Sequence, residues 1–156
     1  MVEFENKGKP LSESEITTWE KTQGFSLPAD YRQFLLTVNG GRPTPDVFDI
    51  PGAGASTVHT FNSLHDNSPY DLDEDMQAYS GRLPSRMITV ASDDCGNVLA
   101  MSVSGNDLGF IYFWDHELEA DPHQGEDPES IDNLTMLTKS FQEFVDSLRA
   151  PSPEEQ

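Results

Sequence analysis

Side chains capable of chemistry gather at residues 115–121, directly after the most apolar stretch of the chain. The stretch GFIYFW ends, and five titratable groups follow within seven residues: Asp115, His116, Glu117, Glu119 and Asp121. An Asp-His-Glu group at the end of a strand is a combination found in metal sites and in acid–base pairs. A buried strand that emerges into water gives the same pattern, so two interpretations compete at this point.

Strand geometry favours the second interpretation. Successive side chains of an extended chain point to opposite faces, so Asp115 and Glu117 share a face while His116 points away. A hard cation needs several oxygens that converge on one point. We therefore expect a solvated strand exit whose acids can contact a protein partner, and a metal-dependent hydrolase built on these three residues is the least favoured hypothesis. Trp114, at the boundary, is a candidate half-exposed binding anchor.

A second acidic group, DLDED at residues 71–75, has acids at alternate positions, like the start of a calcium loop. An EF-hand loop needs Gly at its sixth position and Glu at its twelfth, and this chain has Met76 and Arg82 there. The match fails. We expect a solvated acidic loop that can contact something positive.

No other motif predicts catalysis. The four histidines show no metal-ligand spacing, and His59 lies in a strand pattern typical of a hydrogen-bonded structural residue. Cys95 is the only cysteine, so the chain can form neither an internal disulfide nor a thiolate metal site. There is no phosphate loop and no GxSxG turn. The sequence predicts a protein without enzymatic activity, metal or cofactor.

Charge constrains the partner. Twenty-eight Asp and Glu against nine Lys and Arg give a formal net charge of −19, and only two bases accompany twelve acids from Ile111 onward. Such a surface repels nucleic acid and anionic lipid and attracts basic proteins. The N-terminus has no apolar signal region, and no apolar run is long enough to cross a bilayer. We expect a cytoplasmic protein with a basic protein partner, and no direct contact with nucleic acid or membrane.

Sequence signals for helices occur near both ends of the chain. SESE has the form of a capping box between Ser12 and Glu15, and Gly24 suits the end of that helix. Pro28 opens a second helix, which ends at the NGG of residues 39–41. Its buried stripe has helical spacing: Tyr31, Phe34, Leu35 and Val38. A last helix is predicted over roughly residues 133–148, from apolar positions along one side: Leu134, Leu137, Phe141, Phe144 and Leu148.

Between these helices the periodicity is that of strands. Short strands are predicted at 47–50 and 56–61, and the acidic region 65–81 enters a short helix. A meander follows, with strands at 87–91, 97–103 and 110–114. The fold class predicted is α+β, with an antiparallel or mixed sheet flanked by two N-terminal helices and a C-terminal helix. We expect one domain over residues 1–150 and a disordered tail at 151–156.

Three blocks together resemble a known family. LPADYRQFLLTVNGG (27–41) is similar to the LP-x-x-[YF]-x-x-F-L-x-x-x-NGG signature of the SMI1/KNR4, or SUKH, superfamily. ITVASDDCGNVLAMSVSGNDLGFIYFWDHE (88–117) resembles its D-x-x-G-N turn and the G-x-[VI]-Y-x-W strand. SFQEFVDSL (140–148) looks like its closing helix. The blocks follow the family's order and cover most of residues 15–148.

The resemblance implies a fold and a class of function. It implies an α+β scaffold without an established catalytic set. Bacterial members of the family are mostly immunity proteins of polymorphic and contact-dependent toxin systems, and fungal members are regulators of cell-wall synthesis and signalling. Residues 63–81 and 115–133 lie outside the family pattern, and variable loops are where partner specificity is placed on a shared scaffold.

Two functions remain open. The first is an immunity protein that binds and occludes the active site of a cognate toxin, such as a basic nuclease, with carboxylates where substrate phosphates would lie. The alternative is an intracellular scaffold or regulatory module that binds proteins without a toxin partner. The residues expected at the partner interface are Asp71, Asp73, Glu74, Asp75, Trp114, Asp115, Glu117, Glu119 and Asp121.

Overall fold

Local signals near the N-terminus form two helices as predicted. In the computed structural model, which describes residues 1–156, Ser12 caps helix α1 (Glu13–Gln23) by accepting a hydrogen bond from the Glu15 N–H at 3.2 Å. The Glu15 carboxylate accepts the Ser12 N–H in return, which completes the capping box. Gly24 ends the helix in the left-handed conformation. Helix α2 (Ala29–Thr37) begins directly after Pro28.

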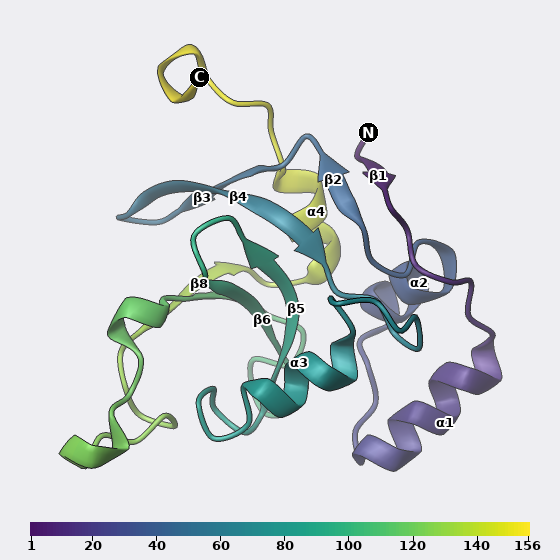
Figure 1. Ribbon diagram of the computed structural model, residues 1–156, viewed down its shortest axis with the longest axis horizontal. Helices are drawn as coiled ribbons and strands as arrows, with labels where there is room; N and C mark the ends of the chain where they lie inside the picture. The colour runs from purple at the N-terminus through teal and green to yellow at the C-terminus, as the bar shows by residue number, and fades with distance from the viewer.

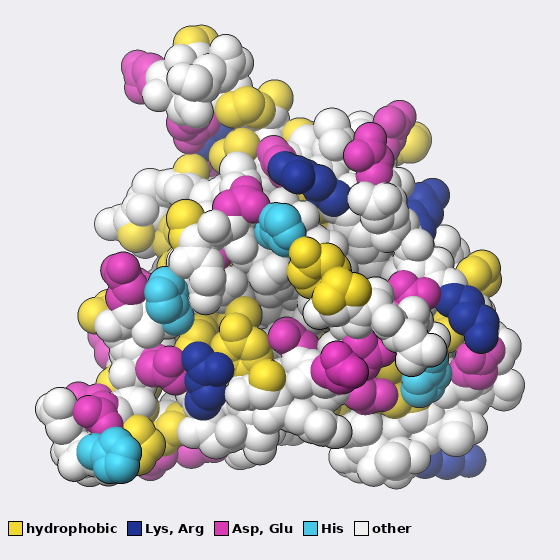
Figure 2. Space-filling model, viewed as in Figure 1, with side chains coloured by type: hydrophobic (Ala, Val, Ile, Leu, Met, Phe, Trp, Pro, Cys, Tyr) yellow, Lys and Arg dark blue, Asp and Glu magenta, His cyan; other side chains and the backbone are white.

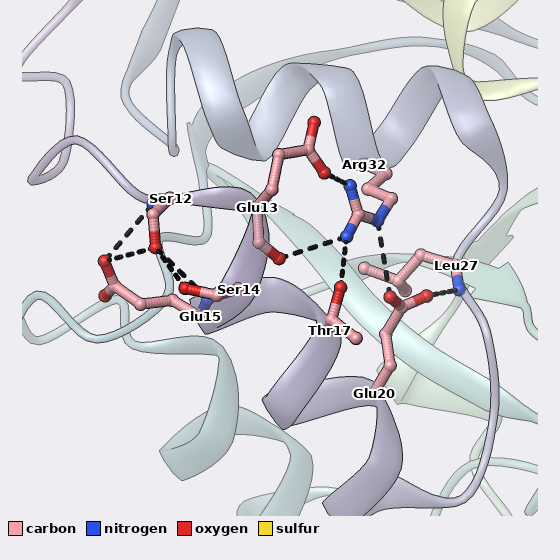
Figure 3. Close-up of polar contacts among 8 residues, drawn as sticks. All are labelled: Ser12, Glu13, Ser14, Glu15, Thr17, Glu20, Leu27 and Arg32. Atoms are coloured by element: carbon pink, nitrogen blue, oxygen red, sulfur yellow. Dashed lines mark hydrogen bonds and ion pairs between the residues drawn. The ribbon is translucent and has the colours of Figure 1, made fainter.

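Arg32 fastens α2 to α1, as Figure 3 shows. Its guanidinium donates to the Thr17 hydroxyl at 2.7 Å, and it pairs with the carboxylates of Glu13 and Glu20. Glu20 also accepts the Leu27 N–H at 2.6 Å, which fixes the connection between the two helices. These contacts hold the two helices together as one unit.

The strands form two antiparallel sheets. The larger sheet has the order β3-β4-β5-β6-β7-β8, and the smaller one pairs β1 with β2. The larger sheet consists of β3 (Val47–Ile50), β4 (Gly54–Phe61), β5 (Met87–Asp93), β6 (Val98–Ser102), β7 (Ile111–Trp114) and β8 (Leu134–Thr138). The smaller sheet, β1 (Glu3–Glu5) and β2 (Arg42–Thr44), was not predicted. The α+β class and the antiparallel meander are confirmed.

The predicted C-terminal helix is only half helical. Residues 134–138 form the edge strand β8, and helix α4 (Phe141–Ser147) starts after Ser140, whose side chain accepts the Glu143 N–H at 3.1 Å. The spacing of Leu134 and Leu137 fits a helix, but Thr135 and Thr138 favour a strand, and β7 offers a free edge for pairing. Tertiary pairing decides the conformation here, so the prediction of one helix over 133–148 is wrong in its first part.

The core lies between the helices and one face of the sheet. Figure 1 shows α1 and α2 together on one side of the sheet and α4 behind it. Aromatic rings fill the space between them: Phe141 lies 4.9 Å from both Tyr31 and Phe34, centroid to centroid, and 5.6 Å from Phe61. A smaller cluster, centred on Trp114, is separate from this core and includes Leu83, Met87, Val98 and Ala100. The 79–83 segment covers this second cluster.

The two edge strands of the larger sheet approach each other. Strand β3 contacts β8, and Phe144 of α4 lies with both strands around one small pocket. The outer edge of β3 is partly occupied, because Val47 exchanges backbone hydrogen bonds with Arg149. The sheet is therefore curled toward closure, and neither edge is presented as a long flat strand.

The C-terminal residues contact the rest of the domain through one short turn. They project from the body of the domain (Figure 1), yet residues 153–155 form the 3-10 turn η3 (Pro153–Glu155). Arg149 donates two hydrogen bonds, of 2.9 Å each, to the Glu155 carboxylate and two more to Asp49. These bonds tie the tail to β3.

Candidate partner-binding surface

The structure brings the two acidic segments together. The first, residues 71–75, is the N-cap and first turn of helix α3 (Leu72–Ala78) and not the expected loop. The second continues into the 3-10 turns η1 (His116–Leu118) and η2 (Pro122–Gln124). Arg82, just after α3, donates two 3.0 Å hydrogen bonds to the Glu119 carboxylate. Three residues on, the Ser85 N–H donates to Glu129 at 2.6 Å. Figure 2 shows acidic side chains over α3 and along the segment after β7, on the same face of the molecule.

The acids of the first segment shape helix α3. Asp71 is its N-cap and accepts the N–H groups of Asp73 and Glu74, at 3.0 and 3.2 Å. Two other carboxylates hold the helix against the core. Asp73 accepts the indole N–H of Trp19 at 2.6 Å, and Asp75 accepts the Asn62 amide at 3.0 Å. Glu74 is the member of this group that stands exposed without such a contact.

Most acids of the second segment, residues 115–121, also hold local structure. Asp115 caps η1 by accepting the Glu117 N–H, and Asp121 caps η2 by accepting the His123 N–H. Glu119 is held by Arg82. Glu117 is exposed. All eight predicted acids lie in the two joined segments, but six of them also hold local structure, so Glu74 and Glu117 are the two whose charge is free of a structural contact.

Trp114 is buried, contrary to the expectation from its position at a strand end. We expected a half-exposed ring, but the side chain is 0% exposed. The ring of Tyr79 meets it edge-on with centroids 5.5 Å apart, and the Arg82 guanidinium lies 5.6 Å from its centroid. Because the segment after α3 folds over this face of the sheet, Trp114 is a core residue of the second cluster and not a surface anchor.

His116 is held by the D-x-x-G-N turn. Asp93 accepts the N–H groups of Cys95 and Asn97 at 2.9 and 2.7 Å, which closes the turn. The Asn97 side-chain oxygen accepts the His116 N–H at 3.0 Å and lies 2.6 Å from its ring Nδ1. An amide oxygen only accepts, so Nδ1 carries a proton. His116 therefore turns toward Asn97, while Asp115 caps η1, and the two side chains do not converge on one point.

His59 is hydrogen-bonded, as expected. Its Nδ1 lies 2.7 Å from Asp94 Oδ1 and its Nε2 lies 3.1 Å from the Tyr70 hydroxyl. A hydrogen bond from Thr57, assisted by one from His59, holds the pKa of Asp94 below its usual range. These contacts join strand β4 to the turn after β5 and to the loop before α3. Spacing along the chain does not predict them, because Asp94 and Tyr70 belong to separate segments.

A pocket of about 400 Å³ lies between the segments that Arg82 and Ser85 join. Its apolar lining comes from α3, the turn after it and β5: Met76, Tyr79, Leu83, Met87 and Ile88. Asp127 and Glu129 line it from the loop before β8. Sequence reasoning did not single out these two acids, since three separate segments form the pocket and no spacing along the chain marks it.

None of the helices is both long enough and apolar enough to span a bilayer.

Comparison with known proteins identifies a family and a similar protein. The model of the SMI1 / KNR4 family (SUKH-1) matches residues 10–147. A similar protein is the SPbeta prophage-derived uncharacterized protein YokK of Bacillus subtilis (strain 168). The two are 30% identical over 161 aligned positions, which cover 92% of this chain and 74% of that protein.

Proposed function

This chain belongs to the SMI1/KNR4 family (SUKH-1), and from that membership we propose that it is an immunity protein that binds and neutralises a cognate toxin protein. The observation that carries the proposal is the family membership over residues 10–147, together with two acidic segments joined on one face. The similarity to a prophage-derived protein supports the same class of role. The protein acts by binding and not by catalysis.

The charge of the chain supports a basic toxin, and we propose a nuclease. A nuclease active site attracts phosphates, so carboxylates placed over it occupy positions that the substrate would take. With a net charge of −19, the protein also attracts a basic partner from a distance and raises the rate of encounter. A fast encounter matters because a toxin must be captured before it acts.

Co-expression tests the proposal. We expect the protein to restore growth of cells that produce the toxin encoded beside it, and to elute with that toxin as one complex in gel filtration. Continued killing together with separate elution of the two proteins would sink the proposal. A complex with another host protein, in the absence of any neighbouring toxin gene, would favour the scaffold or regulatory function instead.

Charge reversal tests the electrostatic part separately. Glu74→Lys/Glu117→Lys changes the two exposed acids without removing a cap or an ion pair. We expect it to slow association with the toxin by about tenfold at low salt, because encounter rates depend on the summed field. Glu3→Lys/Glu154→Lys makes the same charge change in β1 and η3, away from both segments, and serves as the control. Equal association rates for the two variants would contradict the placement of the interface.

A further inference from the structure

We infer that the pocket between α3, the start of β5 and residues 127–129 receives one arginine side chain of a basic protein partner. The identity of the partner rests on the proposed function. The pocket itself is an independent observation. The pocket combines an apolar floor with an acidic rim and contains no basic group of its own. Its volume, about 400 Å³, falls in the range of small-ligand sites, roughly 300–1,000 Å³.

The rim carboxylates have free oxygens. One oxygen of Glu129, Oε1, accepts the Ser85 N–H at 2.6 Å, and one oxygen of Asp127, Oδ1, accepts the Glu129 N–H at 3.0 Å. These two bonds fix the carboxylates in place, while the second oxygen of each has no partner in the protein. Two oriented carboxylates two residues apart suit the planar guanidinium of arginine, which donates several N–H groups in a fixed fork.

No basic residue of the chain competes for these oxygens. Neither Lys, Arg nor His lines the pocket. The two nearest arginines along the chain are committed elsewhere, since Arg82 pairs with Glu119 and Arg86 pairs with Asp107. Burial raises the pKa of the Tyr79 phenol, and the carboxylate of Asp75 raises it further, whereas the Arg82 guanidinium acts to lower it. The free oxygens of Asp127 and Glu129 are therefore available to a cation from another molecule.

The floor explains why the cation is carried on a side chain. Met76, Leu83 and Met87 offer apolar surface to a methylene stem, and the charged head reaches the rim. A free hydrated metal ion would gain nothing from such a floor. An arginine of a partner protein uses both parts, and arginines inserted into pockets are frequent anchors of protein interfaces.

A short peptide tests the pocket without the toxin. The probe is N-acetyl-Gly-Arg-Gly-amide, titrated into the ¹⁵N-labelled full chain, with the citrulline peptide as its uncharged counterpart. We expect saturable NMR shifts at the amides of Gly81, Ser85 and Ile88 with the arginine peptide only. Non-saturating shifts at these amides, or equal shifts with the citrulline peptide, would overturn the inference.

Matched variants separate the pocket from general charge. Asp127→Asn/Glu129→Gln keeps the oxygens that accept the Glu129 and Ser85 N–H groups but removes both negative charges. We expect it to abolish the peptide shifts, whereas Glu3→Gln/Glu154→Gln, with the same change in charge in β1 and η3 and outside the pocket, retains them. Ser80→Phe, at an exposed lining position, is expected to block the pocket without a change in charge. Shifts that survive D127N/E129Q and S80F contradict the assignment.

The toxin complex distinguishes the two proposals. If the immunity role holds, we expect D127N/E129Q to weaken the complex by about tenfold or more, mainly through faster dissociation. A complex of unchanged affinity in that variant overturns the arginine pocket and leaves the immunity function standing. Saturable peptide binding by a wild-type chain that fails to bind or neutralise the toxin supports the pocket and overturns the immunity function.

Discussion

Arg82 is the side chain that links the two acidic segments. Its guanidinium lies 4.6 Å from the centroid of Tyr79 and 5.6 Å from that of Trp114, and it forms two hydrogen bonds with Glu119. The hydrogen bonds that the guanidinium donates to the Glu119 carboxylate raise the pKa of Arg82. The planar guanidinium therefore covers Trp114 of the second cluster and also links the segment after α3 to Glu119.

Loss of that guanidinium is expected to be measurable. We expect Arg82→Ala to lower the free energy of unfolding by about 1–2 kcal/mol, since it removes a bidentate ion pair near the surface and the cover of a buried indole. Arg82→Lys keeps the charge without the planar fork and is expected to recover less than half of the loss. Urea unfolding, followed by circular dichroism, measures both variants. Full recovery by lysine would show that charge alone matters.

Asp107 gives the chain a specific acid sensitivity. Burial acts to raise the pKa of its carboxyl, but hydrogen bonds from Arg86, Ser102 and Tyr112 outweigh burial and lower the pKa to about 2. An unfolded Asp titrates near 3.9. Because the folded pKa is depressed, the stabilisation is complete well above pH 4 and is lost as the pH falls toward 2.

Asp107→Asn isolates this contribution. We expect the variant to be less stable than the wild type by about 1–3 kcal/mol at pH 7, because a charged acceptor of several bonds becomes neutral. The difference is expected to shrink as the pH falls from 5 to about 2, since the wild type loses its own carboxylate there. Urea unfolding at each pH measures the difference. Parallel curves over that range would refute the role given to Asp107.

Elements with local signals were predicted from the sequence, and elements formed by distant pairing were not. The capping box, Pro28 and the NGG turn act within a few residues, so α1 and α2 could be located. Strand β8 depends on the free edge of β7, and strands β1 and β2 depend on each other across about forty residues. The spacing of apolar residues within one segment does not predict which distant strand that segment will pair with.

Gly41 shows how a small sheet depends on one backbone position. Its φ is +107°, and a Cβ placed there would lie 2.5 Å from the Glu5 carbonyl oxygen, next to the β1–β2 pair. We expect Gly41→Ala to lower stability by at least ~1 kcal/mol more than Gly52→Ala. Gly52 is a suitable control, since its φ is +76° and its Cβ would meet nothing within 4 Å. Thermal unfolding compares the two, and equal losses would mean that only φ matters.

The candidate surface was predicted in its charge but not in its shape. The eight acids named from the sequence do lie in two segments that the fold joins, and that joining rests on Arg82 and Ser85, which carried no signal. Asp127 and Glu129 became candidates only when a pocket placed them beside α3 and β5. The exposure of Trp114 was mistaken because a strand end looks the same in sequence whether or not another segment covers it.

At the scale of the whole molecule, a net charge of −19 opposes the folded state through repulsion among acids. Added salt screens exposed charges, with a Debye length of about 30 Å at 0.01 M and about 10 Å at 0.1 M. We therefore expect the melting temperature of the free protein to rise as sodium chloride increases from about 0.01 to 0.5 M. Differential scanning calorimetry measures it. A melting temperature that falls with salt would mean that the ion pairs outweigh the repulsion.

The approach of β3 and β8 has a consequence for abundance. An exposed sheet edge is a template on which another chain can add its own backbone, and this leads to aggregation. Here the β3 edge is occupied in part by Arg149, and β3 and β8 contact each other beside α4. Because neither edge is open along its length, edge-to-edge pairing between chains, and the aggregation that follows from it, is disfavoured at high protein concentration.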